Sequence, residues 1–80
     1  MKLNEDFLRA YVSVAPLALA FERTLECQIY TQLVIMRPVL DIGCGEGLFA
    51  KILFAEKVDT GIDPNPKELE RARELGAYAE

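Results

Sequence analysis

Three glycines at alternate positions, directly after a short apolar run, constrain the fold of this chain more than any other feature. They are Gly43, Gly45 and Gly47 in the stretch VLDIGCGEG, which covers residues 39–47. The run Val39–Ile42 lacks polar alternation, as is typical of a parallel strand buried on both faces. Glycine allows a positive φ and lets a ligand approach the main chain without meeting a Cβ atom. The stretch therefore predicts a buried strand followed by a turn whose backbone is open to a ligand.

The residues after this turn alternate between helical and extended patterns. An apolar helical face comprises Leu48, Phe49, Ile52, Leu53 and Ala55. Val58–Ile62 predicts a second short strand, and Asn65 followed by Pro66 predicts the start of a further helix. Gly76 is expected to end that helix, and residues 77–80 to begin a third strand. This order predicts an α/β fold in which residues 38–80 form a truncated Rossmann-like βαβα unit with parallel strands.

Two helices are predicted before this unit, in residues 1–37. Asn4 is expected to cap the first helix, whose apolar stripe comprises Phe7, Tyr11 and Val14. The stripe of the second helix has a spacing of four and comprises Leu17, Phe21, Leu25, Ile29 and Leu33. The second helix should end before Pro38, whose ring disfavours a helical residue before it. We expect residues 1–37 to form a helical packing segment in which Tyr11, Cys27 and Tyr30 are packing residues.

Charge and length argue against several functional classes. The net charge is −4, and residues 41–80 hold the whole acidic excess, so no basic stripe is present to hold a nucleic acid. The apolar stretch Val12–Phe21 is about half as long as a membrane helix needs. Glu5 and Asp6 stand where a signal peptide carries basic residues. We therefore expect a cytoplasmic protein that binds neither nucleic acid nor membrane.

The two cysteines fit no metal-binding spacing. Cys27 and Cys44 are the only cysteines, and the chain has no histidine, so no metal site is expected. Without a histidine to act as its base, Cys44 is not expected to be a nucleophile. We interpret Cys44 as a small side chain that fits the tight turn.

A glycine turn of this kind lies at the carboxyl edge of the sheet, where cofactors bind. The spacing of its glycines indicates whether it is a dinucleotide-binding turn. Dinucleotide-binding folds have the pattern G-x-G-x-x-G, whose last glycine allows close packing of helix and strand. Here that position is Leu48, and the third glycine comes one residue earlier, at Gly47. In addition, Asp41 precedes the first glycine by two residues, and Asp63 ends the second predicted strand. Leu48 in place of the last glycine argues against a nicotinamide dinucleotide, whereas an acidic ribose binder is found in nicotinamide enzymes too.

With these features, VLDIGCGEG resembles the first motif of the class I S-adenosylmethionine-dependent methyltransferases. The stretch GIDPNP, residues 61–66, is similar to the acidic end of their second strand. The resemblance implies that Gly43 and Gly45, with Gly47 closing the turn, line the methionine part of S-adenosyl-L-methionine by backbone contact. It implies that Asp41 faces the amino group of the cofactor, directly or through water. The plain alternative is that Asp41 only caps its own turn.

The resemblance also assigns the second acidic position. It implies that Asp63 accepts hydrogen bonds from both ribose hydroxyls, and that Pro64 lies against the adenine. The alternative is that Asp63 is only a strand-end residue. The cofactor carries a sulfonium and an ammonium against one carboxylate, so the acids at Asp41, Glu46 and Asp63 suit it better than they suit a diphosphate.

The resemblance implies that the chain is the cofactor-binding half of a methyltransferase, which transfers a methyl group by in-line displacement. No catalytic base can be nominated, and the acceptor, expected to be a small molecule, is not identified. The alternatives are a non-catalytic binding or assembly module and, third, a nicotinamide dinucleotide-binding domain. Because the two predicted strands lack a third full partner, we expect self-association or pairing with another chain.

Overall fold

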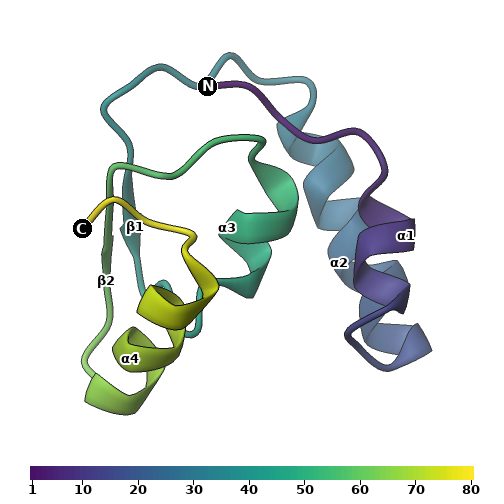
Figure 1. The fold of residues 1–80 in the computed structure, drawn as a ribbon. Coiled ribbons are helices and arrows are strands. Elements are labelled where there is room, and N and C mark those ends of the chain that lie inside the picture. The colour runs from purple at the N-terminus through teal and green to yellow at the C-terminus, as the bar shows by residue number, and fades with distance from the viewer.

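The computed structural model, which describes residues 1–80, joins two short parallel strands through a helix. In chain order, the elements are α1 (Phe7–Val12), α2 (Leu17–Tyr30), β1 (Leu40–Ile42), α3 (Leu48–Leu53), β2 (Thr60–Ile62) and α4 (Pro66–Leu75). Two helices therefore precede a truncated Rossmann-like α/β unit, as the sequence predicts (Figure 1).

The strands pair in register at Leu40 with Thr60, Asp41 with Gly61, and Ile42 with Ile62. Beyond α4 the chain returns to the segment just before β2, where Tyr78 forms a parallel bridge with Val58. The N–H of Ala79 donates to the carbonyl of Val58 at 2.8 Å. Residues 77–80 thus pair alongside β2, on the side away from β1, as the predicted start of a third strand would, but they form a single bridge and the sheet has two strands.

The elements form layers in which α3 lies between the strands and the α1–α2 pair (Figure 1). Right-handed crossovers place α3 and α4 on the same face of the sheet, and α1 packs on α3 rather than on the opposite face. That opposite face is bare: the side chains of Leu40, Ile42 and Ile62 are exposed. The prediction that the first strand is buried on both faces is wrong for this chain, because every helix stacks on one side.

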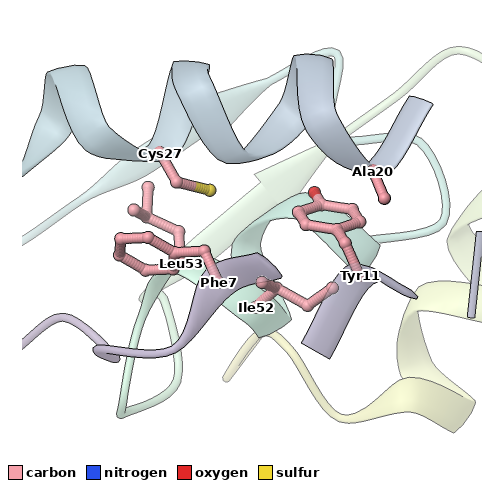
Figure 2. Packing of buried hydrophobic residues seen from close by; sticks show 6 residues of the cluster. All are labelled: Phe7, Tyr11, Ala20, Cys27, Ile52 and Leu53. Atoms are coloured by element: carbon pink, nitrogen blue, oxygen red, sulfur yellow. The ribbon is translucent and has the colours of Figure 1, made fainter. Parts of the chain in front are cut away.

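The core lies where α1, α2 and α3 meet (Figure 2). Its buried residues are Phe7, Tyr11, Ala20, Cys27, Ile52 and Leu53. Tyr11 and Cys27 are therefore packing residues, as expected. Tyr30 is more exposed, but its ring contacts Phe49 edge to face, with the centroids 5.8 Å apart. A second cluster of Ala50, Val58 and Ala77 joins α3 to the segment before β2 and to the C-terminal segment.

The buried face of α2 differs from the one that its apolar period predicts. Leu17, Phe21, Leu25 and Ile29 are all more than half exposed, and Leu33 lies beyond the end of the helix. The helix instead buries Ala20, Thr24 and Cys27. These small side chains allow α1 to approach the backbone of α2 closely, so the large apolar residues face away from the core.

The helix caps agree with the sequence in α4 but not in α1. Asn65 accepts from the N–H of Lys67 at 3.0 Å, and Gly76 ends the helix at φ +73°, as predicted. In α1 the cap is Asp6, whose Oδ1 accepts from the N–H of Arg9. Asn4, predicted for this role, donates instead to the carbonyls of Ile52 and Phe54 at 2.9 and 2.8 Å. It satisfies carbonyl groups that the end of α3 leaves free.

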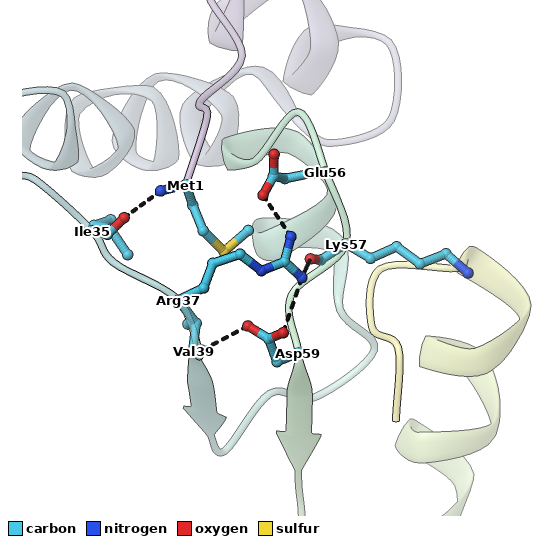
Figure 3. A network of polar contacts seen from close by, with 7 residues as sticks. All are labelled: Met1, Ile35, Arg37, Val39, Glu56, Lys57 and Asp59. Carbon is cyan, nitrogen blue, oxygen red and sulfur yellow. Dashed lines mark hydrogen bonds and ion pairs between the residues drawn. The ribbon is translucent and has the colours of Figure 1, made fainter.

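A polar network closes the amino edge of the sheet (Figure 3). The Arg37 guanidinium donates to Glu56 at 2.7 Å and to Asp59 at 2.9 Å, and Asp59 also accepts from the N–H of Val39 at 2.7 Å. Hydrogen bonding to Arg37 holds the pKa of Asp59 below its usual value. The N-terminal ammonium also donates to the carbonyl of Ile35. None of the four helices combines the length and the apolar composition that crossing a membrane requires.

Candidate functional site

The glycine turn lies at the carboxyl edge of the sheet, and its three glycines share one backbone conformation. Gly43, Gly45 and Gly47 have φ angles of 72°, 57° and 83°, a region that side-chain-bearing residues rarely adopt. The N–H groups of Gly43 and Cys44 both donate to the carbonyl of Ile62, at 2.8 and 2.9 Å. The alternate spacing of the glycines therefore follows from a turn that repeatedly enters the left-handed region while it stays tied to the end of β2.

The outer side of this turn is bare backbone. A Cβ atom placed on Gly43 would meet no heavy atom within 4 Å, and one on Gly45 would meet only Glu68 Oε2, at 3.9 Å. These two residues therefore form an open stretch of main chain that a ligand can touch without displacing a side chain. The structure places both of them as the sequence predicts for a ligand-contacting turn.

Gly47 has a different environment from the other two glycines. It is buried, and a Cβ atom there would lie 2.8 Å from Tyr78 Cε2 and 3.2 Å from the Cβ of Ala77. Gly47 thus closes the turn by letting the start of α3 approach the C-terminal segment closely. The last glycine of the dinucleotide pattern allows close packing of helix and strand. In this chain Gly47, one residue before that position, allows the close packing.

Asp63 ties the end of β2 to the glycine turn. Its Oδ2 accepts from the N–H of Gly45 at 3.0 Å, and its Oδ1 accepts from the N–H of Asn65 at 2.9 Å. Each carboxylate oxygen can accept a second hydrogen bond, so both oxygens retain capacity for a ligand hydroxyl. Pro64, the next residue, is exposed beside them. The structure brings Asp63 and the glycines together, although they are far apart in the sequence.

Asp41 is half-buried on β1, and its carboxylate has a partner that the sequence reasoning missed. The hydroxyl of Tyr78 donates to Asp41 Oδ2 at 2.5 Å. The Tyr78 ring crosses Gly61, where a Cβ atom would lie 2.8 Å from two ring atoms. The signal for this contact was a glycine inside a strand, which often marks the close approach of another group. The identity of that group depends on the return of the chain after α4.

The pKa of the Cys44 thiol is affected by the negative charges near the turn. Burial raises the pKa of this thiol, and the nearby carboxylates of Asp41 and Asp63 raise it further. Cys44 therefore remains a neutral thiol at pH 7, in agreement with its interpretation as a non-nucleophilic turn residue. No three His, Cys, Asp or Glu side chains gather into a metal-binding group.

The N-terminal helices border the glycine turn. An open hollow of about 460 Å³ has Tyr11, Leu19 and Arg23 on one side and Gly45 and Gly47 on the other. The sequence left open whether the helices cover the ligand edge of the sheet. The hollow shows that they reach the turn and enclose space beside it.

The parallel strands, the left-handed glycine turn and the strand-end acid define a Rossmann-like unit of the kind that binds a cofactor at its carboxyl edge. The methyltransferase domain family matches residues 40–80, just over half of the chain, and the chain belongs to that family. No curated protein and no solved structure matches this chain.

Proposed function

We propose that this chain is the cofactor-binding half of an S-adenosyl-L-methionine-dependent methyltransferase. The observation that carries the proposal is the position of Asp63 beside the bare backbone of Gly43 and Gly45, inside the region that matches the methyltransferase domain family. When bound, the cofactor supplies an activated methyl group for in-line displacement by an acceptor.

The chemistry of the site fits this cofactor. Gly43 and Gly45 would contact its methionine part through the main chain, since no Cβ atom fills the space beside them. Asp63 would accept from the ribose hydroxyls with its remaining lone pairs, and exposed Pro64 would lie against the adenine. Asp41 would face the ammonium group. The acidic surroundings of the turn favour a ligand that carries a sulfonium and an ammonium.

The residues of this chain bind and orient rather than transfer protons. We nominate no catalytic base in the glycine turn, because the chain has no histidine, Cys44 remains a neutral thiol and the carboxylate of Glu46 is exposed to solvent. Aligning the acceptor with the methyl group would be the main catalytic contribution of the complete site. The acceptor, for which we propose a small molecule, would bind outside the turn.

The proposal is tested by isothermal titration of the 80-residue chain with S-adenosylhomocysteine and, separately, with NAD. The key variant is Asp63→Asn, which keeps the shape of the side chain and removes its charge. Asp59→Asn is the matched control, because Asp59 also holds a backbone N–H of the neighbouring segment, but at the opposite edge of the sheet. Thermal melting of both variants verifies that they fold.

We expect the wild-type chain to bind S-adenosylhomocysteine and not NAD. Asp63→Asn should weaken binding by about tenfold or more, as the loss of hydrogen bonds to a charged group predicts, whereas Asp59→Asn should change affinity less than about twofold. Tighter binding of NAD would favour a nicotinamide domain. If a folded chain binds neither ligand, a non-catalytic assembly module becomes the better interpretation.

We also propose that the chain self-associates through its bare apolar faces. Leu40, Ile42 and Ile62 on the sheet, and the stripe of α2, expose large side chains that a stable monomer rarely leaves uncovered. Light scattering should give a mass above the 9.0 kDa of one chain. A monodisperse monomer with cooperative melting would contradict this expectation.

A further inference from the structure

The contact between Tyr78 and Asp41 joins two residues that lie on different segments of the sheet. Asp41 is on β1, Tyr78 is on the segment beyond β2, and Gly61 lies between them on β2. The phenol therefore reaches across a whole strand to donate to the carboxylate at 2.5 Å. Gly61 makes this possible, since any side chain there would occupy the space of the ring.

The geometry holds the hydroxyl in one place. The Tyr78 ring lies against both Gly61 and Gly47, each of which would place a Cβ atom 2.8 Å from a ring atom. Burial, followed by the hydrogen bond to Asp41, raises the pKa of Tyr78 above its ordinary value. The phenol thus remains protonated and continues to donate throughout the neutral range.

This bond occupies only one oxygen of Asp41. Oδ2 accepts from Tyr78, whereas Oδ1 accepts no hydrogen bond within the chain. Asp41 directly precedes Ile42 and the glycine turn, so fixing its carboxylate also fixes the direction in which Oδ1 points relative to the turn. A carboxylate held in this way loses less rotamer entropy when a cation binds.

We propose that Tyr78 is a positioning residue that holds the Asp41 carboxylate ready for the ammonium group of the cofactor. This inference rests on the proposed function, because Asp41 meets an ammonium only if the turn binds the amino-acid end of such a ligand. The alternative is a purely structural role, in which the pair of Tyr78 and Asp41 only connects the C-terminal segment to β1. Stability measurements cannot distinguish the two roles, whereas recognition of the ligand's ammonium can.

The test compares two ligands on the wild type, two single variants and their double variant by isothermal titration. The ligands are S-adenosylhomocysteine and its analogue without the α-amino group, and the proteins are the wild type, Tyr78→Phe and Asp41→Ala. Phenylalanine keeps the ring on Gly61 and removes only the hydroxyl, so the fold should persist, and thermal melting verifies this. The double variant Tyr78→Phe/Asp41→Ala completes a cycle that measures the coupling between the two residues.

The wild type should prefer S-adenosylhomocysteine over the analogue by about tenfold or more, as expected for a charge-assisted hydrogen bond. Tyr78→Phe should reduce this preference to about threefold or less, while its affinity for the analogue stays within about twofold of wild type. In the Asp41→Ala background, Tyr78→Phe should have no further effect. These results would support the positioning role.

Two other outcomes would overturn the inference, and they are distinguishable. If the wild type binds S-adenosylhomocysteine but Tyr78→Phe keeps the full preference for it, the proposed function stands and Tyr78 is only structural. Additive losses in the double variant lead to the same conclusion. If the folded wild type does not bind S-adenosylhomocysteine, the proposed function fails, and the positioning role fails with it.

Discussion

The glycine turn and the outer face of α2 are both unusual surfaces, for opposite reasons. In the turn, small residues are outside and the main chain itself is exposed at Gly43. On α2, small residues are inside, and large apolar side chains such as Leu25 and Ile29 are exposed. The turn is determined by backbone conformations that few residues adopt. The orientation of α2 is determined by which of its faces lets a neighbour approach most closely.

Within the turn, the buried Gly47 should tolerate substitution far less than the exposed Gly43. Gly47→Ala should lower the free energy of unfolding by about 2–4 kcal/mol, because the left-handed φ and the overpacking against Tyr78 both oppose a Cβ atom. Gly43→Ala is the control, since it carries only the conformational cost of about 1–2 kcal/mol. Urea unfolding measures both variants. Equal losses would mean that the close packing at Gly47 contributes nothing.

A second pair of variants tests which face of α2 is buried. Ala20→Leu should destabilise the chain by about 1–3 kcal/mol, because Ala20 is fully buried in the core that α2 forms with α1. Leu25→Gln, on the exposed stripe, should change the stability of the monomer by less than about 0.5 kcal/mol when both variants are measured below the concentration at which the chain self-associates. Chemical denaturation distinguishes the outcomes. The reverse order of effects would show that α2 packs through its apolar stripe after all.

A smaller effect is expected from pH, and it involves two groups of the helical core, Cys27 on α2 and Tyr11 on α1. Burial raises the pKa of Cys27 to about 11 and that of Tyr11 to about 12. Because these pKa values exceed those of the unfolded chain, the stabilisation is complete below about pH 8.5. It is lost as the pH rises through about 11 for Cys27 and about 12 for Tyr11.

The measurement is the urea midpoint between pH 8 and 11 in the presence of a reductant. The wild type should lose stability over this range more steeply than Cys27→Ala, which has no thiol to ionise at that site. Parallel curves would indicate that the Cys27 thiol reaches solvent in the folded chain.

The conformation of the glycine turn could be predicted from the sequence, whereas the orientation of α2 could not. The glycine turn, the Asn65 cap and the Gly76 stop were predictable, because each residue type satisfies a local backbone requirement. The buried face of α2 was not, since its stripe of large apolar residues would suit any partner and the period does not identify one. Asn4 was misassigned for a related reason: its side chain serves α3, which is distant in the sequence.

In the site, too, the sequence predicts contacts that follow from strand order and misses those that depend on the path of a distant segment. Asp63 and the glycines could be paired from the sequence, because the carboxyl ends of parallel strands meet at one edge. The contact of Tyr78 with Asp41 could not, since it depends on how the C-terminal segment returns across Gly61.

The most direct test that the glycine turn binds the cofactor is a titration of the ¹⁵N-labelled chain with S-adenosylhomocysteine, followed by ¹H–¹⁵N correlation spectra. We expect the largest shift changes at the amides of Gly43, Gly45, Asp63 and Asn65, with little change at Asp59 on the opposite edge of the sheet. Binding that shifts the outer face of α2 and leaves the glycine turn unchanged would contradict this expectation. A folded chain whose spectrum does not respond to the ligand would contradict it as well.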